Sequence, residues 1–257
     1  MNTFNLKRFL MLFKKHSYEK GKEYILSILT ITIIQIVLFI YAAYMNASGL
    51  KENYQQVFFI VGILLCGMIF TSMIFSDLND KRKATSYLTL PASHLEKYLV
   101  NWLFSYLIFQ LVFISVFYIA TYAVLSLGIN EFGAGNKAIN IFNKENQIYI
   151  VFYVYLLVHS LILYGAIFFK KKHFIKIILT LFILGLALTF INKLLLTIMI
   201  DENVMTEPPF TNLRFLNENK FYSIQIVESN LFATSLLAAI VILLWLSSFY
   251  RLKEKEV

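Results

Sequence analysis

The sequence has few of the residues that covalent cross-linking and acid–base chemistry need. It contains one cysteine, Cys66, and three prolines among 257 residues, and none of its long apolar runs contains an aspartate or glutamate. A single cysteine excludes an intrachain disulfide, and Cys66 is interpreted as a small packing residue. Runs without carboxylates argue against a proton- or sodium-driven carrier and against an intramembrane enzyme that uses paired acidic groups.

A nucleotide-binding loop is also missing. The dipeptide Gly21-Lys22 has neither the upstream glycine nor the following hydroxyl residue that a phosphate cradle requires. No metal-binding or cofactor-binding pattern is present, and we expect no enzymatic activity in this chain. The longest polar stretches are about 20–30 residues, too short to fold as a separate soluble domain.

Long apolar runs are abundant instead. Hydrophobic residues make up 59% of the chain and the mean hydropathy is +0.68. Each run approaches or exceeds the roughly 20 residues that a helix needs to cross a bilayer. Because backbone amides in lipid must be satisfied within their own segment, we expect an all-α protein with six transmembrane helices in one domain, residues 1–257. The runs are Ile25–Met45, Val57–Phe75, Leu99–Leu127, Gln147–Phe169, Phe174–Met199 and Leu231–Tyr250.

The basic residues predict the orientation. If the N-terminus is cytoplasmic, 17 of the 23 lysines and arginines fall on the cytoplasmic side and five on the outer side. This positive-inside bias predicts that both termini are cytoplasmic. It also accounts for the net charge of +8, so the basic pI does not indicate a nucleic-acid partner. The abundance of Ile, Lys, Asn and Phe suggests a bacterial gene, and we expect a multi-pass protein of the bacterial plasma (inner) membrane.

The first 24 residues predict a helix that lies along the membrane surface. Leu6, Phe9, Leu10 and Phe13 have the spacing of one helical face, and basic residues occupy the other. A basic helix of this kind lies flat in the interface. Gly21 is expected to break it before the first span. One interpretation is a simple membrane anchor, and the other is an elbow helix that also contacts a cytoplasmic partner.

The segment 77–98, between the second and third spans, combines a charge cluster with exposed apolar residues. Pro91 disfavours helix at the residue before it, and Ser93 followed by Glu96 is a capping box that predicts a new helix. The segment is either an ordinary cytoplasmic loop or a docking loop for a soluble protein. The outer segment 200–230 contains Pro208-Pro209 and two short apolar pieces, for which a lid, a dip into the outer leaflet and a flexible loop all stay open.

The full layout resembles the permease subunit of type-2 ABC transporters, an exporter class with a G-subfamily-like fold. The run Tyr87-Leu88-Thr89-Leu90-Pro91-Ala92-Ser93, followed by Glu96-Lys97-Tyr98, is similar to the Leu-Pro-x-Ser segment that follows the second span in bacterial members. The resemblance implies a coupling loop at 77–98 that docks on a separate ATP-binding subunit, which would hold ATP and Mg. It also implies a dimer of permeases, homo- or heterodimeric, and export of an amphiphilic substrate. The docking residues it implies are Lys81, Arg82, Lys83, Tyr87, Leu88 and Leu90, supported by Phe9 and Phe13 of the elbow helix.

Five polar residues inside the spans are candidates for lining a transport path. They are Gln35, Gln110, His159, Asn192 and Lys193. Each also has a structural interpretation: an interhelical hydrogen bond for the amides and His159, and snorkelling to the interface for Lys193. Two other functions stay open: a membrane-embedded accessory or sensor protein, and an intramembrane enzyme. Activity of the isolated chain that is lost on His159→Ala would favour the enzyme.

Overall fold

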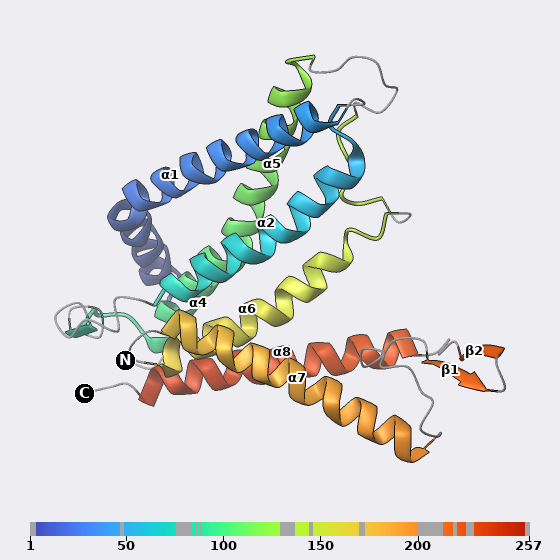
Figure 1. Ribbon diagram of the computed structural model, residues 1–257. Helices are drawn as coiled ribbons and strands as arrows, with labels where there is room; N and C mark the ends of the chain where they lie inside the picture. Colours follow the sequence, from blue (N-terminus) through green and yellow to red (C-terminus); the bar gives the residue numbers. More distant parts are fainter. Residues whose placement is uncertain are drawn as a thin grey trace.

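The computed structural model consists of long helices that meet near one end and diverge toward the other (Figure 1). It describes residues 4–46, 49–75, 84–85, 87, 89–128, 137–143, 146–169, 173–199, 213–217, 220–224 and 229–254. At 173–174, 177, 181, 213–217, 220–224 and 229–233 only the backbone is described. Among these residues, six helices are long and apolar enough to cross a membrane, which confirms the predicted all-α polytopic architecture.

The helices agree closely with the apolar runs. Helix α4 continues through a π-helical segment, Phe104–Ile108, into α5, so that the three form the third spanning helix, His94–Leu125. The bounds are α1 Leu6–Met45, α2 Glu52–Met73, α4 His94–Leu103, α5 Phe109–Leu125, α6 Ile150–Phe168, α7 His173–Met199 and α8 Ser229–Glu254.

The predicted break at Gly21 is wrong. Helical hydrogen bonding continues from Leu6 to Met45, so the amphipathic N-terminal part and the first span form a single helix. A lone glycine costs a helix interior only about 1 kcal/mol relative to alanine, which does not interrupt a helix of this length. Figure 1 shows that α1 nevertheless changes direction, with its darkest-blue N-terminal part turned away from the rest.

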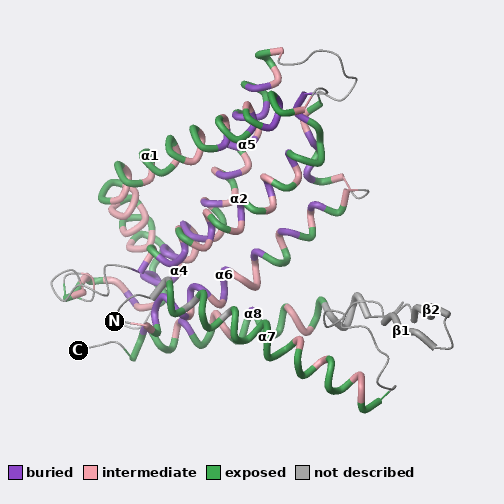
Figure 2. Tube along the Cα trace, viewed as in Figure 1, coloured by how far each residue is buried: buried purple, intermediate pink, exposed green. Residues whose placement is uncertain are grey.

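The core is aromatic and lies between α1, α2, α5 and α6. Phe39, Phe59, Phe117 and Tyr155 are fully buried. The Phe59 and Phe117 rings meet edge to face at 4.9 Å between centroids, a geometry that aromatic pairs favour. In Figure 2 the buried positions gather on the facing sides of these helices, whereas α7 is almost entirely exposed.

The segment between α7 and α8 contains a β-hairpin. Strands β1, Leu213–Asn217, and β2, Lys220–Ile224, pair antiparallel with Asn217 opposite Lys220. They overlap the two short apolar pieces of this segment, Phe210–Leu216 and Phe221–Val227. The two strands are separated by two residues, Glu218 and Asn219, which lack the glycine that a sequence signal for a two-residue hairpin requires.

One end of the bundle, which we call the terminal end, holds the start of α1 and the end of α8 (Figure 1). The end of α2, the start of α4 and the end of α6 lie at the same end. Tyr87 and Leu90 of the predicted docking loop lie at the terminal end, beside α1 and the end of α2. The β-hairpin lies at the opposite end of α7 and α8 (Figure 1).

Candidate partner-docking site

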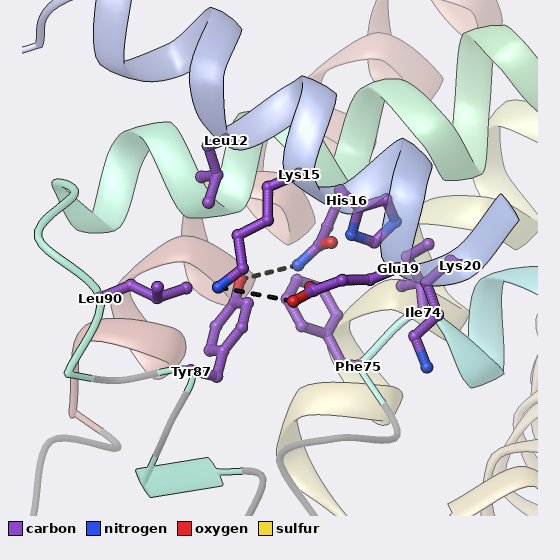
Figure 3. A pocket seen from close by; sticks show the side chains of 10 residues that line it. Leu12, Lys15, His16, Glu19, Lys20, Ile74, Phe75, Tyr87 and Leu90 are labelled. Carbon is purple, nitrogen blue, oxygen red and sulfur yellow. Dashed lines mark hydrogen bonds and ion pairs between the residues drawn. The ribbon is translucent and has the colours of Figure 1, made fainter.

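A small pocket at the terminal end brings together the N-terminal part of α1 and the predicted docking segment. It has a volume of about 50 Å³ and lies where the N-terminal part of α1, the end of α2 and the segment before α4 meet. Figure 3 shows Lys15 and Glu19 of α1 reaching across Tyr87, with Leu90 and Leu12 beside them. The Lys15 and Glu19 charges are 3.6 Å apart and exposed.

The start of α4 confirms the predicted capping box. The Ser93 hydroxyl accepts a hydrogen bond from the Glu96 backbone N–H at 3.2 Å, and a Glu96 carboxylate oxygen accepts one from the Ser93 N–H at 2.9 Å. These two bonds satisfy donors that the first turn of a helix leaves free, and they fix the point where the third spanning helix begins.

Glu96 also ties α4 to the start of α1. Its other carboxylate oxygen, Oε1, accepts from the Asn5 backbone N–H at 2.7 Å and from the Arg8 guanidinium at 3.0 Å. The Glu96 side chain is fully buried, and that of Arg8 is 22% exposed. Asn5 caps α1 in turn by accepting from the N–H groups of Lys7 and Arg8. One carboxylate therefore holds the ends of two helices that are 88 residues apart.

Tyr87 is anchored to α4 by its hydroxyl group. It accepts a hydrogen bond from the Asn101 amide at 2.8 Å and donates a longer one to the Lys97 carbonyl at 3.4 Å. The Lys97 ammonium lies 5.8 Å from the centre of the Tyr87 ring, a cation–π distance. Leu90 is half-buried and lines the pocket. These contacts hold the described part of the docking segment against the protein.

Phe9 and Phe13 of α1 are both half-buried. Phe13 stacks on Phe104 at 4.8 Å, and Phe9 contacts Phe4 at 5.9 Å. Leu6 and Leu10, which share their helical stripe, are more than half exposed. The amphipathic face is thus divided between contacts to the bundle and an apolar surface that remains open.

Four of the predicted docking residues lie outside the part of the chain that the structure describes. They are Lys81, Arg82, Lys83 and Leu88. Their neighbours Phe75, Tyr87 and Leu90 all line the pocket, so the chain enters and leaves the segment at this place.

The polar candidates for a transport path are distributed over four helices. His159 of α6 is fully buried, and its Nε2 lies 2.9 Å from the Ser105 hydroxyl, so the interhelical hydrogen bond is present. Gln35 of α1 is buried and Gln110 of α5 is half-buried. Asn192 is half-buried on α7, and the neighbouring Lys193 is exposed beside Phe190.

Among the described residues, several buried polar atoms near the third spanning helix have no hydrogen-bond partner. They include Nδ1 of His159, the indole nitrogens of Trp102 and Trp245, and both amide atoms of Gln35. His159 is surrounded by rings, with Tyr106 at 5.1 Å and Tyr155 at 5.9 Å between centroids. The described residues contain no group of three or more histidine, cysteine or acidic side chains that could hold a metal.

Ser105 is a residue that sequence reasoning missed. It lies in the π-helical segment, is fully buried, and its carbonyl accepts a hydrogen bond from the Tyr155 hydroxyl at 3.0 Å. π-Helical turns are rare and occur often at functional sites. Ser105 and His159 are 54 positions apart, so their hydrogen bond depends on how two helices pack. The local sequence around Ser105 contains no signal for it.

Comparison of the chain with protein-family models, with curated proteins and with solved structures gave no match.

Proposed function

We propose that this protein is the membrane-spanning subunit of a type-2 ABC exporter in the bacterial plasma membrane. Both termini face the cytoplasm, and a separate subunit binds ATP and Mg and hydrolyses the nucleotide. Two permease chains pair, as a homodimer or heterodimer, and move an amphiphilic substrate across the membrane.

The observation that supports this function best is the set of hydrogen bonds that Glu96 accepts from Asn5, Arg8 and Ser93, which we call the Glu96 joint. It holds the amphipathic start of α1 and the beginning of the third spanning helix together at the terminal end. A soluble partner that binds the adjoining 77–98 segment would contact both elements at once. Docking there would therefore act on two spanning helices rather than on an isolated loop.

The third spanning helix connects this joint to the interior of the membrane. It runs without interruption from His94 to Leu125, and about 1.5 Å of rise per residue carries it across the bilayer. The π-helical segment Phe104–Ile108 is a place where hydrogen bonding along this helix can rearrange. A partner that binds one of two arrangements more tightly shifts the protein toward it, which is how an ATPase would drive a permease.

Partner capture tests the proposal. The chain is purified from its native membrane in mild detergent, and mass spectrometry identifies what co-purifies. We expect an ATP-binding subunit with the wild-type chain, and its loss when Lys81, Arg82 and Lys83 are changed to glutamate or when Leu88 is changed to aspartate. Lys253→Glu, an exposed basic residue at the end of α8, is the matched control and should retain the subunit.

Two outcomes would contradict this function. Capture of the chain without an ATP-binding subunit, under conditions that keep other ABC complexes intact, would favour a membrane-embedded accessory or sensor protein. An ATP-binding subunit that binds the charge-reversed and Leu88→Asp variants as tightly as the wild type would remove the 77–98 segment from the docking surface. Membrane insertion of each variant is measured in parallel, because a chain that fails to insert cannot report on docking.

A further inference from the structure

We propose that a groove between α1, α2 and the third spanning helix binds one membrane phospholipid. An acyl chain occupies its apolar end, and a zwitterionic head group lies at its polar end. Binding of a lipid here requires only that the chain resides in a membrane, whether or not it transports a substrate.

The apolar end of the groove is a pocket of about 150 Å³ lined almost wholly by aliphatic and aromatic side chains. Ile28 and Ile31 of α1 form one side, and Phe109 and Val112 of α5 form the other. An apolar cavity of this size stays free of water and accepts small hydrocarbons. In a bilayer, the hydrocarbon that is available to fill it is an acyl chain.

A second pocket of about 260 Å³ continues the groove toward the terminal end. It shares Tyr24, Ser27 and Phe70 with the apolar pocket, so the two are contiguous. Its far end is polar, because Lys20 and Glu23 line it. The groove therefore changes from apolar to charged along its length, as a phospholipid does.

An aromatic cluster marks the change in polarity. The Tyr24 hydroxyl lies 2.6 Å from the His16 Nε2, while the Tyr24 ring packs on Phe70 at 5.3 Å and on Phe104 at 5.7 Å. Tyrosine favours the water–lipid boundary, with its ring in the apolar layer and its hydroxyl among polar groups. Tyr24 is thus placed to lie at the level where a head group meets its chains.

The charge distribution along α1 indicates that the boundary between water and lipid lies near Tyr24. The last charged residues of the helix are Lys20, Lys22 and Glu23, and from Ile25 to Met45 it has no charge. The polar end of the groove therefore lies at head-group level. Lys20 and Glu23 are 3.4 Å apart and present both signs of charge, which complements a phosphate and an ammonium in one head group. This charge balance favours a zwitterionic lipid such as phosphatidylethanolamine over an anionic one.

Native mass spectrometry of the full-length protein tests the site. The protein is delipidated in detergent, supplied with phosphatidylethanolamine or phosphatidylglycerol, and the retained lipid is measured. We expect one phosphatidylethanolamine per chain, retained at least about tenfold less by Val112→Trp, which fills the apolar pocket. Leu111→Trp is the matched control, because Leu111 is the preceding residue and is 66% exposed on another face of α5.

A head-group variant provides an independent measurement that does not alter the packing of α5. Lys20→Ala should reduce retention of phosphatidylethanolamine, while Lys22→Ala, two residues away and exposed, should leave it unchanged. Equal retention by Val112→Trp and Leu111→Trp, or no lipid on the wild-type chain, would overturn the site. Tighter retention of phosphatidylglycerol than of phosphatidylethanolamine would overturn the assigned head group.

Discussion

The carboxylate of Glu96 is fully buried, and both of its oxygens accept hydrogen bonds. Three donors converge on it: two backbone N–H groups and one guanidinium. The Ser93 N–H is buried, and a buried donor without its acceptor costs more free energy than an exposed ion pair contributes. The hydrogen bonds that join Asn5 and Arg8 to the start of α4 therefore depend on a single residue.

We expect Glu96→Ala to lower the free energy of unfolding by about 1–3 kcal/mol, because the buried Ser93 N–H and two partly exposed donors, the Asn5 N–H and the Arg8 guanidinium, lose their charged acceptor. Thermal unfolding of the detergent-solubilised protein measures the change. The variants Glu96→Ala and Arg8→Ala should be non-additive when combined, since they share one interaction.

The exposed Lys15–Glu19 pair is the matched control for this cycle. Removing it should change stability by less than about 1 kcal/mol. A Glu96→Ala effect as small as the Glu19→Ala effect would show that the joint contributes little to the fold.

Helices α2 and α6 pack closely at Gly67, which has no side chain. A Cβ atom placed on Gly67 of α2 would clash with the ring of Tyr155 on α6. Tyr155 cannot move aside freely, because it is fully buried and its hydroxyl donates to the Ser105 carbonyl. Small residues that allow close packing are typical of helix pairs in membranes.

Gly67→Ala should therefore destabilise the α2–α6 pair by about 1–3 kcal/mol, the range for overpacking a filled core. Gly185→Ala is the control, because Gly185 lies in α7 with no atom within 4 Å of an added Cβ. Alanine at that position should be neutral or stabilising by up to about 1 kcal/mol. Thermal unfolding in detergent compares the two, and equal melting temperatures would contradict the close contact.

For the molecule as a whole, the distribution of basic residues and the arrangement of the helices agree. The lysines and arginines of the start of α1 and the end of α8 belong to segments at the terminal end (Figure 1). An even number of spans puts both ends of the chain on one side of a membrane. The positive-inside bias predicts that this side is the cytoplasm.

Cysteine labelling measures the orientation. In a Cys66→Ser background, Phe142→Cys, at an exposed position between α5 and α6, should react with a membrane-impermeant maleimide in intact cells. Lys253→Cys, exposed near the end of α8, should react only after permeabilisation. The reverse pattern would invert the orientation, and reaction of both from one side would contradict the spanning arrangement.

Most of the fold could be predicted because a membrane-spanning helix is a local property of the chain. The run predicted at Ile25–Met45 ends where α1 ends, and that at Phe174–Met199 matches α7 to within one residue at its start. The capping box at Ser93 was equally predictable, since its partners are three residues apart. The continuity of α1 through Gly21 was missed because tolerance of one glycine depends on the helix on both sides of it.

The contacts around the predicted docking segment were only partly predictable. The resemblance implied Tyr87, Leu90 and the elbow helix as docking candidates, whereas nothing in the sequence indicated that Glu96 would bind Arg8. Within the bundle the sequence identified His159 as a hydrogen-bonding residue and did not identify Ser105 as its partner. Both pairs join residues more than 50 positions apart, so each depends on how whole helices pack.

The sequence by itself determined the number and placement of the spanning helices and the distribution of charge along the chain. Both follow from the transfer of apolar and charged groups between water and lipid, which each segment experiences independently of the others. The tertiary structure alone decided the Glu96 joint, the Ser105–His159 pair and the groove that runs from Lys20 to Val112. In a bilayer, helices pack through shape and a few polar contacts rather than through hydrophobicity, so contacts between them cannot be read from apolar runs.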